Sequence, residues 1–199
     1  ITGTITVNVV ADPVAPTATK SPNVTTVCAG ATLTLTGVTD NGGGTGTCNI
    51  EYSANGGTWT TTLPSFAATV GTNTIAIRKN CNGTGCDISA VNTYSWTVVA
   101  DPVAQTITPS VANGSTLCVG GTVSATFSGG SGGTGTITDT YEFTTNGGGL
   151  WSAYTPGNTI TATTGMLGTN TIQIRTLRTA TGNGCDASAN GWTCAQGPV

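Results

Sequence analysis

Apolar and polar side chains alternate in short runs along most of the chain. In NTIAIRKNC, residues 73–81, the two isoleucines stand at alternate positions, and ATLTLTG, residues 31–37, has the same two-residue period. Val, Ile, Thr and aromatic residues fill such runs, and Gly and Asn separate them, which is typical of β-strands joined by turns. No apolar pattern with a 3.6-residue period is long enough to predict a helix. We therefore predict an all-β fold.

The strand pattern is organised as two repeats. The seam VVADPV at residues 9–14 returns at residues 98–103, and WTCAQGPV at the end of the chain is a diverged form of WTVVADPV at residues 96–103. Between the seams VCAGATLTLTG matches LCVGGTVSATFSG, GTNTIAIR matches GTNTIQIR, and GCDISA matches GCDASA. The first seam is repeated after 89 residues and the second after 96. Turn signals about every ten residues fit two tandem seven-stranded sandwiches, residues 11–99 and 100–199.

Residues 1–10, ITGTITVNVV, precede the first seam, where the last strand of an earlier repeat is expected. Alone, such a strand leaves its backbone unpaired and its apolar face exposed. We expect it to belong to a preceding repeat of a longer chain or to a neighbouring subunit, into which it inserts by strand donation. The chain has no signal peptide, transmembrane run or initiator Met, as expected of a mature or excised segment.

The segment ITPSVANGSTLCVGGTVSATFSG, residues 107–129, resembles the opening of bacterial immunoglobulin-like domains. The GCD step before the last strand of each repeat is similar to tandem repeats in secreted and cell-surface proteins of Bacteroidota, including gliding and adhesion proteins. This resemblance implies two tandem immunoglobulin-like β-sandwich domains of an extracellular adhesin or filament, and it implies no catalytic residues.

The register between two neighbouring strands of the first repeat follows from their residue types. In an antiparallel pair the residue numbers of opposed positions have a constant sum. Residues 47–53 and 73–81 meet this condition, because Cys48 then faces Cys81 and Glu51 faces Arg78. We therefore predict a Cys48–Cys81 disulfide and a Glu51–Arg78 ion pair on the opposite, wetter face.

The same argument applies to the second repeat. Asp139 faces Arg178 and Glu142 faces Arg175, so an ion pair replaces the disulfide of the first repeat. Exposed cross-strand ion pairs of this kind contribute roughly 0–1 kcal/mol each. The pleat also places six residues on the core face: Tyr52, Ile75, Ile77, Phe143, Ile172 and Ile174.

The seven cysteines favour an oxidising, extracellular or cell-surface location. The alternative, a metal site, is weak because Cys81 and Cys86 are the only close pair and the chain has no His. Two pairings of the remaining repeated cysteines stay open. One is a bridge within each repeat, Cys28–Cys86 and Cys118–Cys185, and the other is Cys28–Cys185 across the junction. Cys194 is expected to be a buried free thiol, a partner of Cys118 or an intermolecular link.

Several function classes are disfavoured by composition. Without His, catalytic triads and most zinc sites are ruled out, and no pair of acidic residues stands out as catalytic, so we expect no enzyme. Charged residues make up 7% of the chain, the net charge is −3, and the five basic residues are dispersed. This distribution argues against nucleic-acid binding. We also expect no membrane insertion and no cofactor.

Two ligand classes remain as weaker expectations. Asp12, Asp101 and Asp40 are candidate calcium ligands where repeats abut, although Asp-Pro steps are more simply turn formers. Four tryptophans are candidates for stacking on surface glycans, but their equivalent positions in the two repeats favour a structural role: Trp59, Trp151, Trp96 and Trp192. The expected function is structural, with copies of the chain or adjacent repeats as partners, and a carbohydrate-binding module is the alternative.

Overall fold

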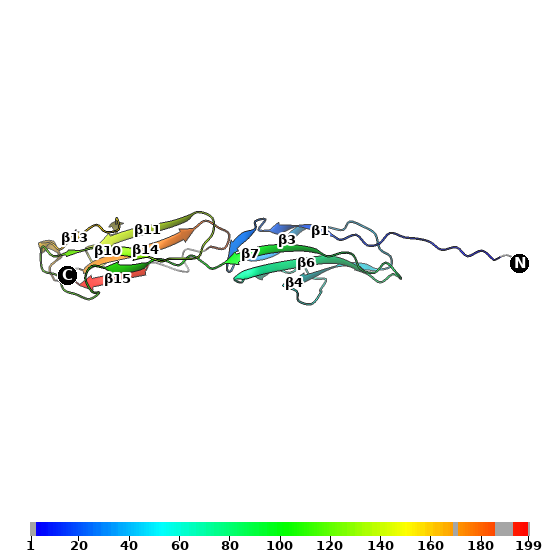
Figure 1. Ribbon diagram of the computed structural model, residues 1–199, viewed down its shortest axis with the longest axis horizontal. Coiled ribbons are helices and arrows are strands. Elements are labelled where there is room, and N and C mark those ends of the chain that lie inside the picture. Colours follow the sequence, from blue (N-terminus) through cyan, green and yellow to red (C-terminus); the bar gives the residue numbers. More distant parts are fainter. Residues whose placement is uncertain (1–2, 169–170, 186–192, 199) are drawn as a thin grey trace. The chain divides into compact units, whose positions relative to one another are not determined.

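The structure is a computed structural model that describes residues 3–168 and 171–185 with their side chains and residues 193–198 by their backbone (Figure 1). Within these ranges the chain is all-β, and its one helix is a 3-10 turn, η1 (Thr164–Met166). No helix in this part of the chain is long and apolar enough to cross a membrane. The chain divides into two compact units, Ile1–Val98 and Val99–Val199, so the boundary falls within the second VVADPV seam.

The first unit contains two sheets, in which the pairs β1–β3, β3–β5, β4–β6 and β6–β7 are antiparallel. One has the strand order β1-β3-β5 and the other the order β2-β7-β6-β4. The strands are β1 (Thr17–Ser21), β2 (Thr26–Cys28), β3 (Thr32–Thr39), β4 (Cys48–Ala54), β5 (Phe66–Ala67), β6 (Gly71–Cys81) and β7 (Asn92–Val99).

Both sheets of the first unit contribute to one apolar core. Leu33 and Leu35 of β3 are buried in the same cluster as Ile75 of β6 and Trp96 of β7. Each such side chain stabilises the unit by about 1.5–3 kcal/mol through its removal from water. The indole N–H of Trp96 donates to the carbonyl oxygen of Pro22 at 2.9 Å, so its polar edge is satisfied inside the core.

The second unit has a larger sheet with the order β12-β11-β14-β15 and two smaller pairs, β10-β8 and β13-β9. The bounds are β8 (Thr106–Pro109), β9 (Thr122–Val123), β10 (Ala125–Ser128), β11 (Ile137–Thr144), β12 (Ser152–Ala153), β13 (Ile160–Thr161), β14 (Thr171–Ala180) and β15 (Thr193–Pro198). The core gathers residues from these sheets around Tyr154: Val123, Ala125, Ile160, Ile172 and Ile174. The hydroxyl of Tyr154 donates to the carbonyl of Asn158 at 2.7 Å.

The predicted register of β4 and β6 is confirmed. Cys48 lies opposite Cys81 and is joined to it by a disulfide, and Glu51 lies opposite Arg78. In the second unit β11 and β14 place Asp139 opposite Arg178 and Glu142 opposite Arg175. Phe143 is partly buried against the core of the second unit. The other five of the six residues expected on the core face are buried: Tyr52, Ile75, Ile77, Ile172 and Ile174.

Candidate functional site at the seam end of each unit

The first seam is held by a glycine-rich loop of its own unit. The N–H of Val14 donates to the carbonyl of Gly42 at 3.0 Å, and the N–H of Gly44 donates to the carbonyl of Ala11 at 2.9 Å. Gly43 lies between these bonds with φ +70°, and a Cβ atom on it would approach the carbonyl oxygen of Asp12 to 2.1 Å. Only glycine permits this approach, so the loop is a clasp with a defined backbone rather than the flexible connection that its composition indicates.

The second unit repeats the clasp. The N–H of Gly133 donates to the carbonyl of Ala100 at 2.8 Å, and Val103 and Ser131 exchange two backbone bonds of 2.8 and 3.2 Å. A Cβ atom on Gly132 would meet the carbonyl oxygen of Asp101 at 2.0 Å. The seam proline is buried in both units, as Pro13 and as Pro102. The Asp-Pro step is therefore docked onto the unit that follows it.

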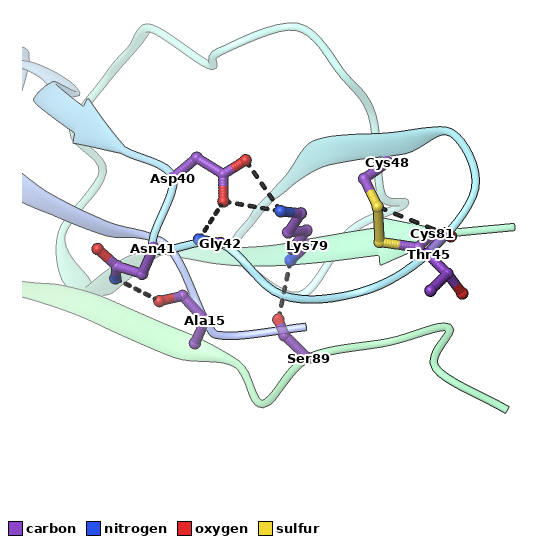
Figure 2. Close-up of polar contacts among 9 residues, drawn as sticks. All are labelled: Ala15, Asp40, Asn41, Gly42, Thr45, Cys48, Lys79, Cys81 and Ser89. Atoms are coloured by element: carbon purple, nitrogen blue, oxygen red, sulfur yellow. Dashed lines mark hydrogen bonds and ion pairs between the residues drawn. A yellow bond between two sulfur atoms is a disulfide. The ribbon is translucent and has the colours of Figure 1, made fainter. Parts of the chain in front are cut away.

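An ion pair between a buried lysine and a half-exposed aspartate lies near the first clasp, as Figure 2 shows, and the side chain of Asp40 is 48% exposed. The ammonium group of Lys79 contacts both carboxylate oxygens of Asp40, a weak calcium candidate in the sequence, at 2.9 and 3.0 Å. Lys79 points inward like Ile75 and Ile77 on β6, and only 5% of it is exposed. The ammonium group thus lies at the margin of the core, at the end of β6 that the Cys48–Cys81 disulfide joins to β4.

The carboxylate of Asp40 is already neutralised by this contact. The hydrogen bond from Lys79, followed by that from the N–H of Gly42, lowers the pKa of Asp40 below the usual value. Asp12, the second calcium candidate, lies instead beside the thiol of Cys86. In the described ranges, no three His, Cys, Asp or Glu side chains form a group suited to a metal ion.

Replacing Asp40 with Asn is expected to lower the free energy of unfolding of the first unit at neutral pH by about 0.5–1 kcal/mol, because the buried ammonium of Lys79 loses a counter-charge that solvent partly screens at the half-exposed carboxylate. Since the folded-state pKa of Asp40 is lowered, its contribution is present above the pKa of the unfolded chain and is lost as pH falls through the folded pKa. Urea unfolding at pH 7 and pH 3 measures this difference.

Lys79→Met is the matched control for this prediction, because it removes both the buried charge and the need for its partner. We expect Lys79→Met to lower stability less than Asp40→Asn does. An effect of Asp40→Asn that is equally large at both pH values would contradict the assignment.

The second unit has different residues at the positions of Lys79 and of the disulfide. Thr176 takes the place of Lys79 and is fully buried, and the Asp139–Arg178 ion pair, with a contact of 2.9 Å, takes the place of the disulfide. A Cβ atom on Gly130 would lie 2.8 Å from the guanidinium carbon of Arg178, so the glycine loop also packs on this ion pair.

The cysteines that flank each unit differ in oxidation state. Cys28 and Cys185 are disulfide-bonded, whereas Cys86 and Cys118 are free thiols. Of the two pairings that the sequence leaves open, the bridges within each repeat, Cys28–Cys86 and Cys118–Cys185, are therefore not formed. Because Cys118 is free, the Cys118–Cys194 bridge is not formed either. Cys194 lies opposite Arg175 in the register of β15, and its side chain lies outside the described residues.

Strand geometry explains why Cys28 and Cys86 do not pair. β2 ends at Cys28 and lies along β7. The part of β7 that it contacts lies opposite the start of β6, as the bond from the N–H of Thr97 to the carbonyl of Thr25 shows. Cys86 follows the other end of β6, where the N–H of Cys81 bonds to Asp87. The 11 residues of β6 span roughly 30 Å, whereas a disulfide requires Cα atoms within about 7 Å.

The two outer tryptophans form a repeated stack with arginine. The guanidinium of Arg78 lies 4.1 Å from the ring centre of Trp59, and that of Arg175 lies 3.8 Å from the ring centre of Trp151. The Glu51–Arg78 pair is consequently less wet than expected, with side-chain exposures of 17% and 20%. Trp96 is a core residue, whereas Trp192 lies outside the described residues.

The seam end of each unit thus combines a clasped linker, a closed strand pair and a flanking cysteine. Neither a protein-family model nor a curated protein matches this chain.

Proposed function

We propose that the chain is a structural segment of an extracellular filament or cell-surface adhesin stalk, built from immunoglobulin-like sandwiches stacked end to end. In this proposal residues 3–10 donate a last strand to a neighbouring copy. The observation that carries the proposal is the exposure of three apolar side chains at alternate positions in this segment, Ile5, Val7 and Val9, which are 89%, 77% and 93% exposed.

The repeat shows what these three side chains are suited to contact. The seams align Val9 with Val98, Val7 with Trp96 and Ile5 with Tyr94, each 89 residues further along. Trp96 and Val98 are buried in the core of the first unit, and Tyr94 packs against it. Residues 3–10 therefore carry the core-facing pattern of a last strand, and they form no strand in the structure.

The place beside β14 of the second unit, which the edge strand β15 occupies, suits this segment. In the first unit Ile75 of β6 lies opposite Tyr94, whereas Ile172, its equivalent, lies opposite Gly197 of the edge strand β15. Ile174 lies opposite Ala195. A donated strand that places Ile5 opposite Ile172 brings a large apolar side chain where β15 brings glycine, which gives the donated strand an advantage in buried area.

The test compares two triple variants in a Cys86→Ser/Cys118→Ser background. We expect the parent protein to form fibres visible by electron microscopy, with light scattering that rises with concentration. Changing Ile5, Val7 and Val9 to Asp is expected to leave a monomer. Changing Thr4, Thr6 and Asn8 to Asp is the control, because these positions align with the exposed face of β7.

A parent protein that stays monomeric up to several hundred micromolar would contradict the filament proposal. Equal loss of assembly in both triple variants would contradict strand donation.

A carbohydrate-binding module is the second candidate, favoured by the half-buried rings of Trp59 and Trp151 at equivalent places. One face of each ring already carries an arginine, which limits the platform left for a sugar. Glycan-array binding that is lost in Trp59→Ala/Trp151→Ala without a change in melting temperature would favour this candidate.

A further inference from the structure

The four cysteines that flank the units form two sets of equivalent positions. Cys28 and Cys118 stand at equivalent places in VCAG and LCVG, and Cys86 and Cys185 stand in the repeated GCD step. Each set contains one oxidised member and one thiol: Cys28 is disulfide-bonded and Cys118 is free, and Cys185 is disulfide-bonded and Cys86 is free. Both positions of the repeat are therefore able to form a disulfide, and each is used once.

The two positions lie at opposite ends of a unit. In the second unit Cys118 belongs to a turn closed by a bond from the N–H of Gly121, and the neighbouring Gly120 bonds to Ala162 just before η1. Cys185 follows the far end of β14, in a turn closed on Gly182. A repeat with a disulfide-forming cysteine at each end can be linked to a neighbour at both ends.

Both free thiols are accessible and have apolar neighbours. Cys118 is exposed and is followed by the half-exposed Val119, and Cys86 is partly exposed with the half-exposed Ile88 two residues later. Desolvation and the neighbouring Asp12 carboxylate raise the pKa of Cys86, so a smaller fraction of this thiol is thiolate at a given pH.

We propose that Cys118 of one copy of the chain forms a disulfide with Cys86 of the next copy, so that each end-to-end junction between copies is covalently closed. This proposal rests on the proposed function, because the copies must first meet end to end. The thiolate of Cys118 attacks a small disulfide such as oxidised glutathione and releases one glutathione thiolate. The thiolate of Cys86 then attacks the mixed disulfide and releases the second, so that two protein thiols are oxidised and one glutathione disulfide is reduced.

Complementation between single variants tests this link. In a glutathione redox buffer the unmodified chain is expected to give a ladder of covalent oligomers on non-reducing gels. Cys86→Ser alone and Cys118→Ser alone are each expected to stay monomeric, and an equimolar mixture of the two is expected to give a dimer. Mass spectrometry of that dimer should find the Cys86 and Cys118 peptides joined.

Other outcomes overturn the proposal. The proposal is overturned if either single variant gives as much covalent dimer as the mixture, or if the mixture gives no dimer. It is also overturned if the ladder persists in Cys86→Ser/Cys118→Ser. Light scattering and electron microscopy of the double variant separate this failure from that of the proposed function. Fibres without a covalent ladder in the unmodified chain overturn the disulfide alone, whereas the absence of both overturns the assembly as well.

Discussion

Replacing both Cys48 and Cys81 with Ala is expected to lower the free energy of unfolding of the first unit by roughly 3–4 kcal/mol, as the chain-entropy model gives for a loop of this size. The bridge closes a separation of 33 residues and joins the ends of β4 and β6, whose pairing supports the core. Urea unfolding of the oxidised protein, followed by tryptophan fluorescence of the buried Trp96, measures the loss.

The free thiols provide the matched control for this prediction. Cys86→Ser/Cys118→Ser also removes two sulfur atoms, but no bridge within the unit is lost, so we expect a change within about 0.5 kcal/mol. Equal midpoints for the Cys48→Ala/Cys81→Ala protein and the parent would show that the bridge does not constrain the unfolded chain.

The register that positions this bridge is predictable from sequence because it needs only residue types and a period of two. Two independent pairs, Cys48 with Cys81 and Glu51 with Arg78, agree on one antiparallel alignment, and a slip of one residue would turn every apolar side chain of β6 outward. The second repeat supplies two more pairs at equivalent positions, so local pattern and pairing chemistry give the same answer.

The inward position of Lys79 was not predictable in the same way. The alternation of β6 does place residue 79 on the core face, but a lysine there is acceptable only with a partner, and the partner comes from the residue directly after β3. Neither repeat signals this contact, because the second repeat has Thr176 at that position and no equivalent of Asp40. A pairwise contact between distant segments, found in one repeat only, leaves no pattern in the sequence.

The pairing of the flanking cysteines also depends on information that the sequence lacks. Equivalent positions in the two repeats leave both a bridge within each repeat and a bridge across the junction open, and the length of β6 between Cys28 and Cys86 excludes the first. The conformation of the glycine-rich loops depends on the fold in the same way. Their composition is typical of flexible linkers, whereas their positive φ angles and close backbone approaches are properties of the folded chain.

Replacing Gly43 with Ala is expected to lower the free energy of unfolding of the first unit by about 2–4 kcal/mol. Part of the loss is the cost of a left-handed φ for alanine, roughly 1–2 kcal/mol. The remainder arises because the added methyl group cannot share space with the carbonyl oxygen of Asp12, so the chain must move apart and weaken the two bonds at Val14 and Gly44. Urea unfolding gives the total, and hydrogen exchange of the Val14 and Gly44 amides reports the clasp.

The adjacent Gly42 separates these two contributions. Its φ is +84°, but a Cβ atom on it would meet nothing within 4 Å, so Gly42→Ala is expected to cost only about 1–2 kcal/mol for the backbone angle. Exchange at Val14 and Gly44 should then stay slow in Gly42→Ala and become fast in Gly43→Ala. If both variants lose the same stability and keep both amides protected, the glycines serve only to turn the chain. If the two variants differ as expected, the unit that follows the seam holds it through the bonds at Val14 and Gly44. These bonds can form because Gly43 has no side chain where the loop approaches Asp12.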